Sequence, residues 1–315
     1  MSAGRELALL SVVAPVYQEE ATIERFCGAV AEALATLPYE LILVDDGSSD
    51  GTRAKLERLA AADNRIKLVL LSRNFGHQAA LTAGLDHVTG NVAVTLDSDL
   101  QDPPSLIPQL LERWRAGADV VYAVRRSRPG ESGFKLRTAR LFYRLFRSLA
   151  SISLEHDTGD FRLLDRGALD ALLSMRERSR FLRGMSIWVG FPQDSVPYDR
   201  DARYAGATKF TPGRMVRFSL DAITAFSYRP LQLATALGFL ISGVAFLAIP
   251  LVIVLKLTGH YLHGFSTVEI TMLLLGGIQL ITIGLIGEYV GRIFDEVKGR
   301  PLYVVRSRRN FDADS

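Results

Sequence analysis

The sequence is almost free of cysteine, and this limits the covalent and metal chemistry open to the chain. Cys27 is the single cysteine among 315 residues. No disulfide can form within the chain, and no cysteine-rich zinc site can be built. Since disulfides are rare in reducing compartments, we expect the globular part in such a compartment. Cys27 itself is predicted to be a small buried residue on a helix.

A strong excess of charge of one sign is also lacking, although basic residues gather locally. The formal net charge is +3 at pH 7. Basic residues cluster in three stretches: 125–147, 200–217 and 292–309. Patches of this kind suit phosphates, anionic lipid head groups or nucleic acid. They lie beside apolar segments without a recognisable nucleic-acid-binding motif, so we expect lipid and phosphate partners and no nucleic acid.

No cleavable leader is expected. The apolar stretch 7–16 is short, contains Pro15 and runs into Tyr17 and two glutamates. That pattern is typical of a buried strand that ends in a loop.

What the chain has in excess is apolar character. Hydrophobic residues make up 48% of it and the mean hydropathy is +0.16, so we expect part of the chain outside water. Two apolar segments, 231–257 and 268–290, are each long enough to supply the about 20 helical residues that cross a hydrocarbon core. The alternative, a pair of buried core helices, would need a very large soluble core.

The residues around these segments predict their orientation. The connecting loop 258–267 carries no Lys or Arg, whereas both outer flanks are rich in arginine. By the positive-inside rule, both flanks lie in the cytoplasm and the loop lies outside. Residues 214–229 mix arginines with apolar residues, which predicts a helix in the membrane interface, with a plain surface helix as the alternative. Residues 136–151 are predicted to form a basic amphipathic helix, with an ordinary solvated face as the alternative.

The first 125 residues alternate between strand-like and helix-like segments. Strands are predicted at 7–14, 40–44, 66–71, 91–96 and 119–123. Helices are predicted at 21–37, 52–62, 78–87 and 104–116. This alternation predicts an α/β fold of the Rossmann-like kind, with a mostly parallel sheet covered by helices on both faces.

Polar clusters follow three of the predicted strands, at 15–20, 45–52 and 97–102. Ligands of such sheets bind at the carboxyl ends of the strands. Asp97 and Asp99 can project the same way from an extended chain, and they repel each other unless a cation lies between them. Their oxygens suit Mg²⁺ or Mn²⁺, completed by phosphate oxygens and water. An ordinary turn is the alternative.

The other two clusters suit a nucleoside. Asp45 and Asp46 follow a buried strand, where carboxylates accept hydrogen bonds from base N–H groups or ribose hydroxyls. The alternative is a glycine turn with Asp50 or Thr52 as the cap of the next helix. Tyr17 in the first cluster could stack on a base or sit in an unremarkable loop.

Together the clusters resemble the signatures of glycosyltransferase family 2, whose members have the GT-A fold. The Pro-x-Tyr-Asn-Glu signature corresponds to residues 15–19, with Gln18 in place of asparagine. The Asp-Asp-Gly-Ser turn corresponds to residues 45–48, and the Asp-x-Asp motif to residues 97–99.

Further motifs resemble the polyprenyl-phosphate branch of that family, which includes dolichol-phosphate mannose synthases and bactoprenol glucosyltransferases. They lie at 73–76, 100–104, 159–162 and 203–209. In the last of them Thr208 replaces a serine and keeps a hydroxyl. The two apolar segments and the exit 287–292 resemble the bactoprenol subgroup.

The resemblance implies roles for individual residues. The nucleotide-sugar would be bound by Pro15, Tyr17, Glu19, Asp45, Asp97 and Gln101. The divalent metal, Mg²⁺ or Mn²⁺, would be held by Asp97, Asp99 and Gln101. Catalytic roles would fall to Asp99, Asp160 and Asp157, the last two near the sugar and acceptor as orienting groups or a base. Phosphate groups, including that of the lipid, would be faced by Arg125, Arg203 and Lys209.

The resemblance also implies the reaction. A hexose would pass, with inversion, from a nucleoside-diphosphate sugar to undecaprenyl or another polyprenyl phosphate at the cytoplasmic membrane face. UDP-glucose is the first expectation for the donor. GDP-mannose, UDP-galactose, a UDP-N-acetylhexosamine and an aminoarabinose-type donor are alternatives.

The expected organisation follows. Residues 1–212 are predicted as the GT-A catalytic domain, 213–230 as a juxtamembrane amphipathic helix, 231–292 as a two-helix transmembrane anchor, and 293–315 as a cytoplasmic basic tail. The protein is expected in the inner (plasma) membrane, with its catalytic domain and both termini in the cytoplasm, among membrane lipids. Small residues in the second apolar segment allow close helix packing, which leaves a homo-oligomer open. These are Gly276, Gly277, Gly284 and Gly287.

The sequence leaves two other functions as alternatives. A processive polysaccharide synthase of the same family carries a Gln-x-x-Arg-Trp motif late in the catalytic domain. Here Gln109, Arg113 and Trp114 have one residue too many between them and come too early. A non-catalytic nucleotide-sugar-binding scaffold is the second alternative, and the intact Asp97/Asp99 pair argues against it.

Overall fold

The computed structural model describes residues 5–125, 158–178, 180–199, 229–258 and 265–311. The chain divides into two compact units. The first, called here the sheet unit, comprises Met1–Arg144, Ile152–Thr211 and Pro301–Ser315. The second, called the helical unit, comprises Leu145–Ser151 and Pro212–Arg300.

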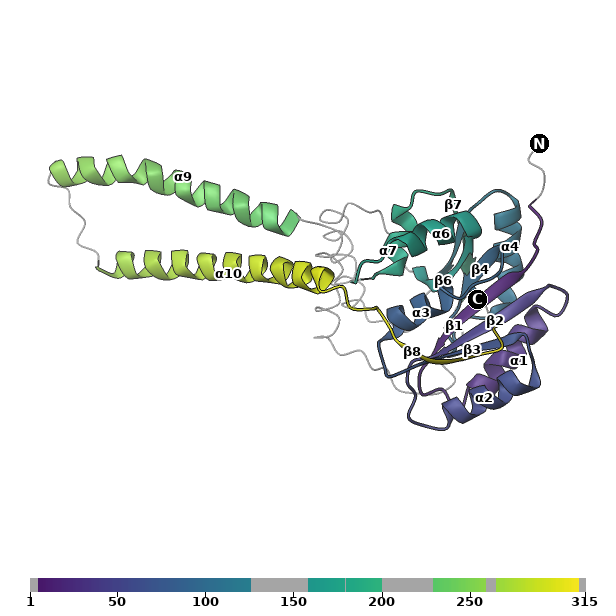
Figure 1. The fold of residues 1–315 in the computed structure, drawn as a ribbon. Helices are drawn as coiled ribbons and strands as arrows, with labels where there is room; N and C mark the ends of the chain where they lie inside the picture. Colours follow the sequence, from purple (N-terminus) through teal and green to yellow (C-terminus); the bar gives the residue numbers. More distant parts are fainter. Residues whose placement is uncertain (1–4, 126–157, 179, 200–228, 259–264, 312–315) are drawn as a thin grey trace. The chain divides into compact units, whose positions relative to one another are not determined.

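The sheet unit is built on one eight-stranded sheet in the order β7-β5-β6-β4-β1-β2-β3-β8 (Figure 1). The strands are β1 (Leu10–Val16), β2 (Tyr39–Asp45), β3 (Ile66–Leu71), β4 (Val92–Thr95), β5 (Val120–Arg125), β6 (Thr158–Asp165), β7 (Gln193–Tyr198) and β8 (Val305–Arg309). Only β6 and β8 pair antiparallel with their neighbours, and the other strands share one direction. The predicted mostly parallel sheet is therefore confirmed.

Helices cover both faces of the sheet, as predicted. One face carries α1 (Ile23–Ala33), α2 (Thr52–Ala62), the 3-10 turn η1 (Pro104–Leu106) and α4 (Ile107–Arg115). The other carries α3 (His77–Leu85), α6 (Arg166–Ser174) and α7 (Leu182–Trp188). Every residue of β1 and β2 is buried, which is why these strands are largely apolar and do not alternate between apolar and polar residues.

Helix α3 lies unusually close to the sheet. A Cβ added to Gly84 would lie 2.3 Å from Cγ1 of Val13 and 3.0 Å from Cγ2 of Val44. Because the first distance is shorter than any normal carbon contact, only glycine allows α3 to approach β1 and β2 this closely.

The bounds of the first helices and strands agree with those predicted from the sequence to within a few residues. β3 and α2 have the predicted bounds, and Cys27 is buried on α1, where burial raises the pKa of its thiol to about 12. The N-cap position of α2 is Gly51, but the carboxylate of Asp50 accepts a hydrogen bond from the Thr52 N–H at 3.1 Å. Asp50 therefore supports the start of this helix, as one alternative predicted.

Strand β8 was not predicted, because the basic tail lacks any apolar alternation. Val305–Arg309 pairs antiparallel with β3 and covers what would otherwise be the edge of the sheet. The residues beside it add side-chain anchors. The Tyr303 hydroxyl donates to the Asp86 carboxylate at 2.7 Å, and the Asn310 amide donates to two backbone carbonyls at 2.5 and 2.8 Å.

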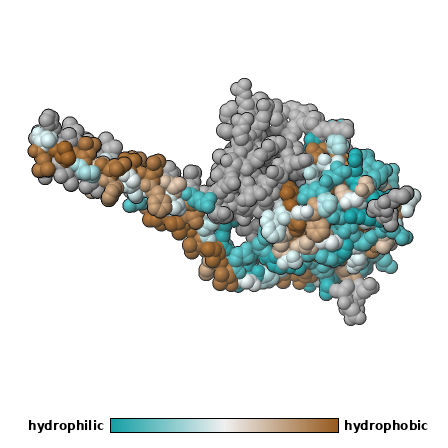
Figure 2. Space-filling model, turned by 90° about the horizontal axis from the view of Figure 1, so that it is seen from above, coloured by the Kyte–Doolittle hydropathy of each residue, from teal (hydrophilic) through white to brown (hydrophobic). Residues whose placement is uncertain are grey.

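The helical unit contains α9 (Arg229–Leu257) and α10 (Phe265–Val297), which contact each other. Their described surfaces are largely apolar and exposed (Figure 2). Among the described helices, one segment, Leu274–Val297, is long and apolar enough to cross a membrane. The apolar stretch in α9, Ala234–Ala248, is shorter. The two predicted transmembrane spans are therefore not confirmed, and one candidate span is supported.

Candidate active site

The predicted site residues that the structure describes meet where the parallel strands of the sheet end. This side of the sheet is called here the carboxyl edge, and the side where those strands begin is called the amino edge. β1, β2 and β4 run parallel, so they end at the same edge. β6 runs antiparallel to β4, with Thr95 opposite Arg162, and its first residues therefore lie where β4 ends. This brings Asp160 to the edge that already holds the residues following Val16 and Asp45.

Asp45, the last residue of β2, and Asp46, which follows it, both bond backbone N–H groups of the loops at this edge. Asp45 is buried, and its carboxylate accepts a hydrogen bond from the Ser48 N–H at 3.0 Å. Asp46 is also buried and accepts from the N–H groups of Phe75 at 2.7 Å and Gly76 at 3.0 Å. Burial raises the pKa of Asp46, and the two N–H donors offset this only in part. Asp46 thus fixes the turn that leads into α3.

The loop after β1 is bonded to the start of α2. The Glu19 N–H donates to the Thr52 hydroxyl at 2.9 Å, and the Glu19 carboxylate accepts a hydrogen bond from the Thr22 hydroxyl. Gln18 has a positive φ of 56°, which turns the chain sharply here. The Tyr17 side chain is 40% exposed. The roles of Tyr17 and Glu19 in a nucleoside pocket stay predictions.

The loop after β4 carries the Asp-x-Asp motif and is pinned to β1. The Ser98 hydroxyl donates to the Pro15 carbonyl at 2.9 Å. The Asp99 carboxylate accepts from the Gln101 N–H at 3.1 Å, across Leu100 with its positive φ of 60°. Gln101 is buried. The backbone of the motif therefore forms a tight turn that is tied to the sheet.

A histidine that the sequence analysis did not single out links two of the predicted aspartates. His77 begins α3, and its Nε2 lies 2.9 Å from Oδ1 of Asp97. Its Nδ1 lies 3.8 Å from Oδ2 of Asp160. Burial opposes the charged imidazolium, but the hydrogen bond to Asp97 and the negative charges of both aspartates outweigh it, so the pKa of His77 is raised.

Asp160 is held as an ionised carboxylate by an arginine that was also not predicted. Nε and Nη2 of Arg183 lie 2.9 Å from its two carboxylate oxygens. Gln78 Nε2 adds a longer contact at 3.4 Å. Burial raises the pKa of Asp160, but the adjacent guanidinium, together with His77 and Arg162, lowers it well below its usual range. So low a pKa makes Asp160 a weak base.

Arg125, the last residue of β5, belongs to a separate network of hydrogen bonds and charges. Its Nε donates to the Tyr198 hydroxyl at 3.1 Å, and its Nη2 is 3.6 Å from Oδ2 of Asp102. The Tyr198 hydroxyl donates to the fully buried Asp102. A Cβ on Gly159 would lie 3.1 Å from Nη2 of Arg125, so this glycine makes room for the guanidinium. Contact of Arg125 with a phosphate stays a prediction.

Several predicted residues lie outside the described part of the chain. They are Asp157, Arg203 and Lys209, together with the predicted helices at 136–151 and, except for Arg229, at 214–229.

The residues that the structure describes fit a metal that is completed by a ligand, not one enclosed by protein. No group of three or more His, Cys, Asp or Glu side chains in the described residues is arranged to hold an ion. Asp97 and Asp99 supply hard carboxylate oxygens from one short turn, and the amide of Gln101 adds a third oxygen donor. Mg²⁺ and Mn²⁺ in nucleotide sites usually take one or two carboxylates and fill their remaining positions with phosphates and water.

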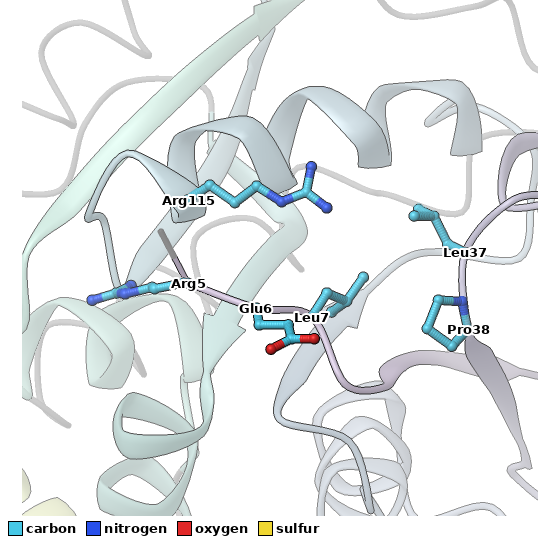
Figure 3. Close-up of a pocket in the computed structure, with 6 residues that line it drawn as sticks. All are labelled: Arg5, Glu6, Leu7, Leu37, Pro38 and Arg115. Atoms are coloured by element: carbon cyan, nitrogen blue, oxygen red, sulfur yellow. The ribbon is translucent and has the colours of Figure 1, made fainter. Parts of the chain in front are cut away.

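A separate pocket of about 480 Å³ opens at the opposite edge of the sheet (Figure 3). Leu7 and Pro38, which line it, precede β1 and β2, so it lies at the amino ends of these strands. It contains none of the predicted site residues. Its other lining residues are Arg5, Glu6, Leu37 and Arg115.

Comparison with known proteins defines the class. The model of "Glycosyl transferase family 2" matches residues 11–173, slightly more than half of the chain. The chain belongs to glycosyltransferase family 2, and with its Rossmann-like, mostly parallel sheet it is a glycosyltransferase of the GT-A fold.

The relatives narrow the branch and confirm the resemblance drawn from the motifs. The chain is 39% identical over 303 residues to the bactoprenol glucosyl transferase of Shigella phage SfX, covering 95% of this chain and 99% of that protein. It is 39% identical over 300 residues to the prophage bactoprenol glucosyl transferase homolog of Escherichia coli K12, covering 94% and 98%. It is also 46% identical over 299 residues to the glycosyltransferase YkcC of Bacillus subtilis, covering 94% and 93%.

A solved structure is similar to this chain at a greater distance. Glucosyl-3-phosphoglycerate synthase from Mycobacterium tuberculosis, crystallised with Mn²⁺, UDP and glucosyl-3-phosphoglycerate, is 22% identical with a TM-score of 0.45. The match covers 67% of this chain and 75% of that one.

The sequence did not predict His77 and Arg183. Both residues act by bonding predicted site residues, His77 to Asp97 and Arg183 to Asp160. His77 directly follows the motif at 73–76 and is the first residue of α3, and this position is the one sequence feature that marks it. Arg183 lies in a short helix far along the chain, and nothing in its local sequence marks it.

Proposed function

We propose that the protein transfers a hexose from a nucleoside-diphosphate sugar, with UDP-glucose as the first candidate, to a polyprenyl phosphate at the cytoplasmic face of a membrane. The observation that carries this proposal is the likeness to bactoprenol glucosyl transferases at 39% identity along nearly the whole chain. The carboxylates of Asp97, Asp99 and Asp160 at the carboxyl edge of the sheet support it, since ligands of open α/β sheets bind there.

The donor would occupy the edge formed by the loops after β1, β2 and β4. Tyr17 would lie against the base, with Pro15, Glu19 and Asp45 shaping the nucleoside pocket. The partly exposed ring of Tyr17 and the buried carboxylate of Asp45 suit a planar base and a hydroxyl or N–H donor, respectively.

Asp97, Asp99 and Gln101 would hold a divalent cation together with the donor diphosphate. Such a cation, when bound, stabilises the negative charge that the leaving nucleoside diphosphate gathers. Arg125, Arg203 and Lys209 would supply charge-assisted hydrogen bonds to phosphate oxygens.

The acceptor needs little help from a base. Its attacking atom is a phosphate oxygen that is already anionic at neutral pH, unlike a sugar hydroxyl. The lowered pKa of Asp160 and its bidentate contact with Arg183 suit an orienting group. We therefore propose that Asp160 positions the reacting groups, and that direct displacement inverts the anomeric carbon. Asp157 stays an alternative for any proton transfer.

The helical unit would keep the enzyme where its acceptor lies. A polyprenyl tail stays in the bilayer while its phosphate sits at the surface, so anchoring raises the effective concentration of acceptor. We propose that α9 and α10 both span the inner membrane, within an anchor at 231–292. The preceding helix at 213–230 would lie in the interface, and the catalytic domain 1–212 and the basic tail would face the cytoplasm.

The test is transfer of label into lipid. Membranes containing the full-length protein are incubated with undecaprenyl phosphate and a panel of radiolabelled nucleotide-sugars, and label is counted in the organic phase. We expect one donor to be used, and excess EDTA to stop the reaction. Donor binding without any transfer would favour the scaffold function, and a long polymer product would favour a processive synthase. Unchanged transfer in EDTA would overturn the role of the metal.

A further inference from the structure

The His77 side chain lies between the carboxylates of Asp97 and Asp160. Its ring contacts Asp97, from the loop after β4, and faces Asp160, from the start of β6. Gln78 Nε2 lies 3.3 Å from its Nδ1. These contacts fit a ring that donates from Nε2 to Asp97 and accepts at Nδ1 from the Gln78 amide.

The backbone that carries His77 is fixed from several sides. Asp46 holds the N–H groups of the two residues before it. Gly84 lets the same helix lie directly on β1 and β2. The side-chain Oε1 of Gln78 accepts a hydrogen bond from the Leu182 N–H at 3.0 Å, which ties the start of α3 to the start of α7. The backbone at His77 is therefore held in place, and this fixes the point from which the imidazole ring reaches Asp97.

Asp97 differs from Asp160 in how it is held. Asp160 is boxed in by Arg183 and Gln78 and is almost fully buried. The side chain of Asp97 is 29% exposed, and among the described residues His77 is the one hydrogen-bond partner of its carboxylate. A carboxylate on a turn can rotate about its side-chain bonds, so this single contact decides which way its oxygens face.

We propose that His77 is a positioning residue for the donor site: by holding Oδ1 of Asp97, it orients that carboxylate so that Oδ2 is presented to the cation and the donor diphosphate. This inference rests on the proposed function. Hydrogen bonds to a metal-binding carboxylate typically change metal affinity or activity by about 10–100-fold when they are removed. His77 itself touches neither metal nor substrate in this role.

The experiment measures cation binding directly, apart from turnover. Full-length protein in detergent is titrated with Mn²⁺ in the presence of UDP, and free Mn²⁺ is followed by electron paramagnetic resonance. For His77→Ala we expect Mn²⁺ affinity to fall by about 10–100-fold. His77→Gln should restore most of it, because its amide nitrogen reaches about as far as Nε2. The shorter His77→Asn should not.

His87 provides the matched control. It lies just past the other end of α3, its Nδ1 is 2.6 Å from the Ala83 carbonyl, and its ring packs against Phe311. His87→Gln should bind Mn²⁺ like the unmodified protein and keep its transferase activity.

The outcomes separate the inference from the function on which it rests. If Mn²⁺ binds the unmodified protein but His77→Ala binds it equally well or more tightly, His77 does not position Asp97 and the inference is overturned. If the unmodified protein binds no Mn²⁺ with UDP, the proposed metal role fails, and the inference with it. If His77→Ala does not fold, the comparison of His77→Gln with His77→Asn decides, and equal affinities there also overturn it.

Discussion

Both edges of the central sheet carry carboxylates, but Glu40 at the amino edge and Asp97 at the carboxyl edge are held in opposite ways. At the amino edge, Glu40 is enclosed by protein donors. Its oxygens accept from the Ser11 hydroxyl, from the N–H and hydroxyl of Thr89 at 3.0 and 2.9 Å, and from Lys67 Nζ at 2.5 Å. At the carboxyl edge, Asp97 has a single hydrogen bond among the described residues and is partly exposed.

The difference teaches how to separate structural from functional carboxylates. Where protein donors enclose a carboxylate, as around Glu40, its charge is neutralised within the fold and contributes to stability. Where acidic groups gather at the ends of parallel strands and are partly exposed, as at Asp97 and Asp99, they suit a cation brought by a ligand. Asp160 combines the two conditions, since it lies at the functional edge but is enclosed by Arg183.

The largest expected effect is on activity alone. Asp99→Asn keeps the size of the side chain and removes a charge at the open edge. Loss of several kcal/mol of charge stabilisation corresponds to a fall in transfer rate of about 10³-fold or more. Thermal melting should change little. A variant that keeps substantial activity would break the comparison, because this edge would then not be a cation site.

The second effect touches both stability and activity. Arg183→Ala leaves the buried charge of Asp160 without its guanidinium, which costs about 3 kcal/mol of unfolding free energy or more. The double variant Arg183→Ala with Asp160→Asn should recover part of that stability, since it removes the uncompensated charge, but not the activity. Denaturation of the unmodified protein and of both variants measures this, and no recovery in the double variant would argue against the Arg183–Asp160 ion pair.

The third effect is on stability alone. Glu40→Ala leaves Lys67 and the Ser11 hydroxyl without their acceptor and should cost about 2–4 kcal/mol. Transfer activity measured well below the melting temperature should stay near that of the unmodified protein. Strong loss of activity in a folded Glu40 variant would erase the distinction between the two edges.

The ion pair of Glu40 with Lys67 predicts that the stability of the protein depends on pH. Burial raises the pKa of Glu40, but hydrogen bonds from Lys67, Ser11 and Thr89 outweigh it and lower the pKa below its usual 4.5. Its contribution to stability is therefore full at neutral pH and is lost as the pH falls through the lowered value. The difference in melting temperature between the unmodified protein and Glu40→Gln should be constant above about pH 5 and shrink below pH 4.5.

The smallest effect concerns β8. Asn310→Ala removes two hydrogen bonds, to the carbonyls of Ala60 and Ile66, and should lower the unfolding free energy by about 1–2 kcal/mol. Activity should be unchanged because these contacts lie on the β8 side of the sheet, away from Asp97. A larger loss than that of Glu40→Ala would mean that β8, and not the amino-edge network, dominates the stability of this region.

Much of this arrangement was accessible from sequence, and the rest was not for physical reasons. Continuous apolar strands and the polar residues that follow them predicted the sheet and the position of Asp45, Asp97 and Asp99. The partners of these residues were harder to predict, because His77 and Arg183 reach the cluster through tertiary packing. Strand β8 was missed because its basic, largely exposed residues show no apolar alternation.

The position of β8 in the chain has a consequence for how the protein is made. Residues 301–315 belong to the sheet unit, while the preceding stretch Pro212–Arg300 belongs to the helical unit. In linear order, the apolar helices are therefore an insertion within the sheet-forming chain and not an appendage after it. During synthesis the last strand of the sheet emerges from the ribosome only after both helices have been made. A water-soluble form should accordingly be obtained by excising the helices and rejoining the ends, since stopping the chain before them would also discard the outermost strand.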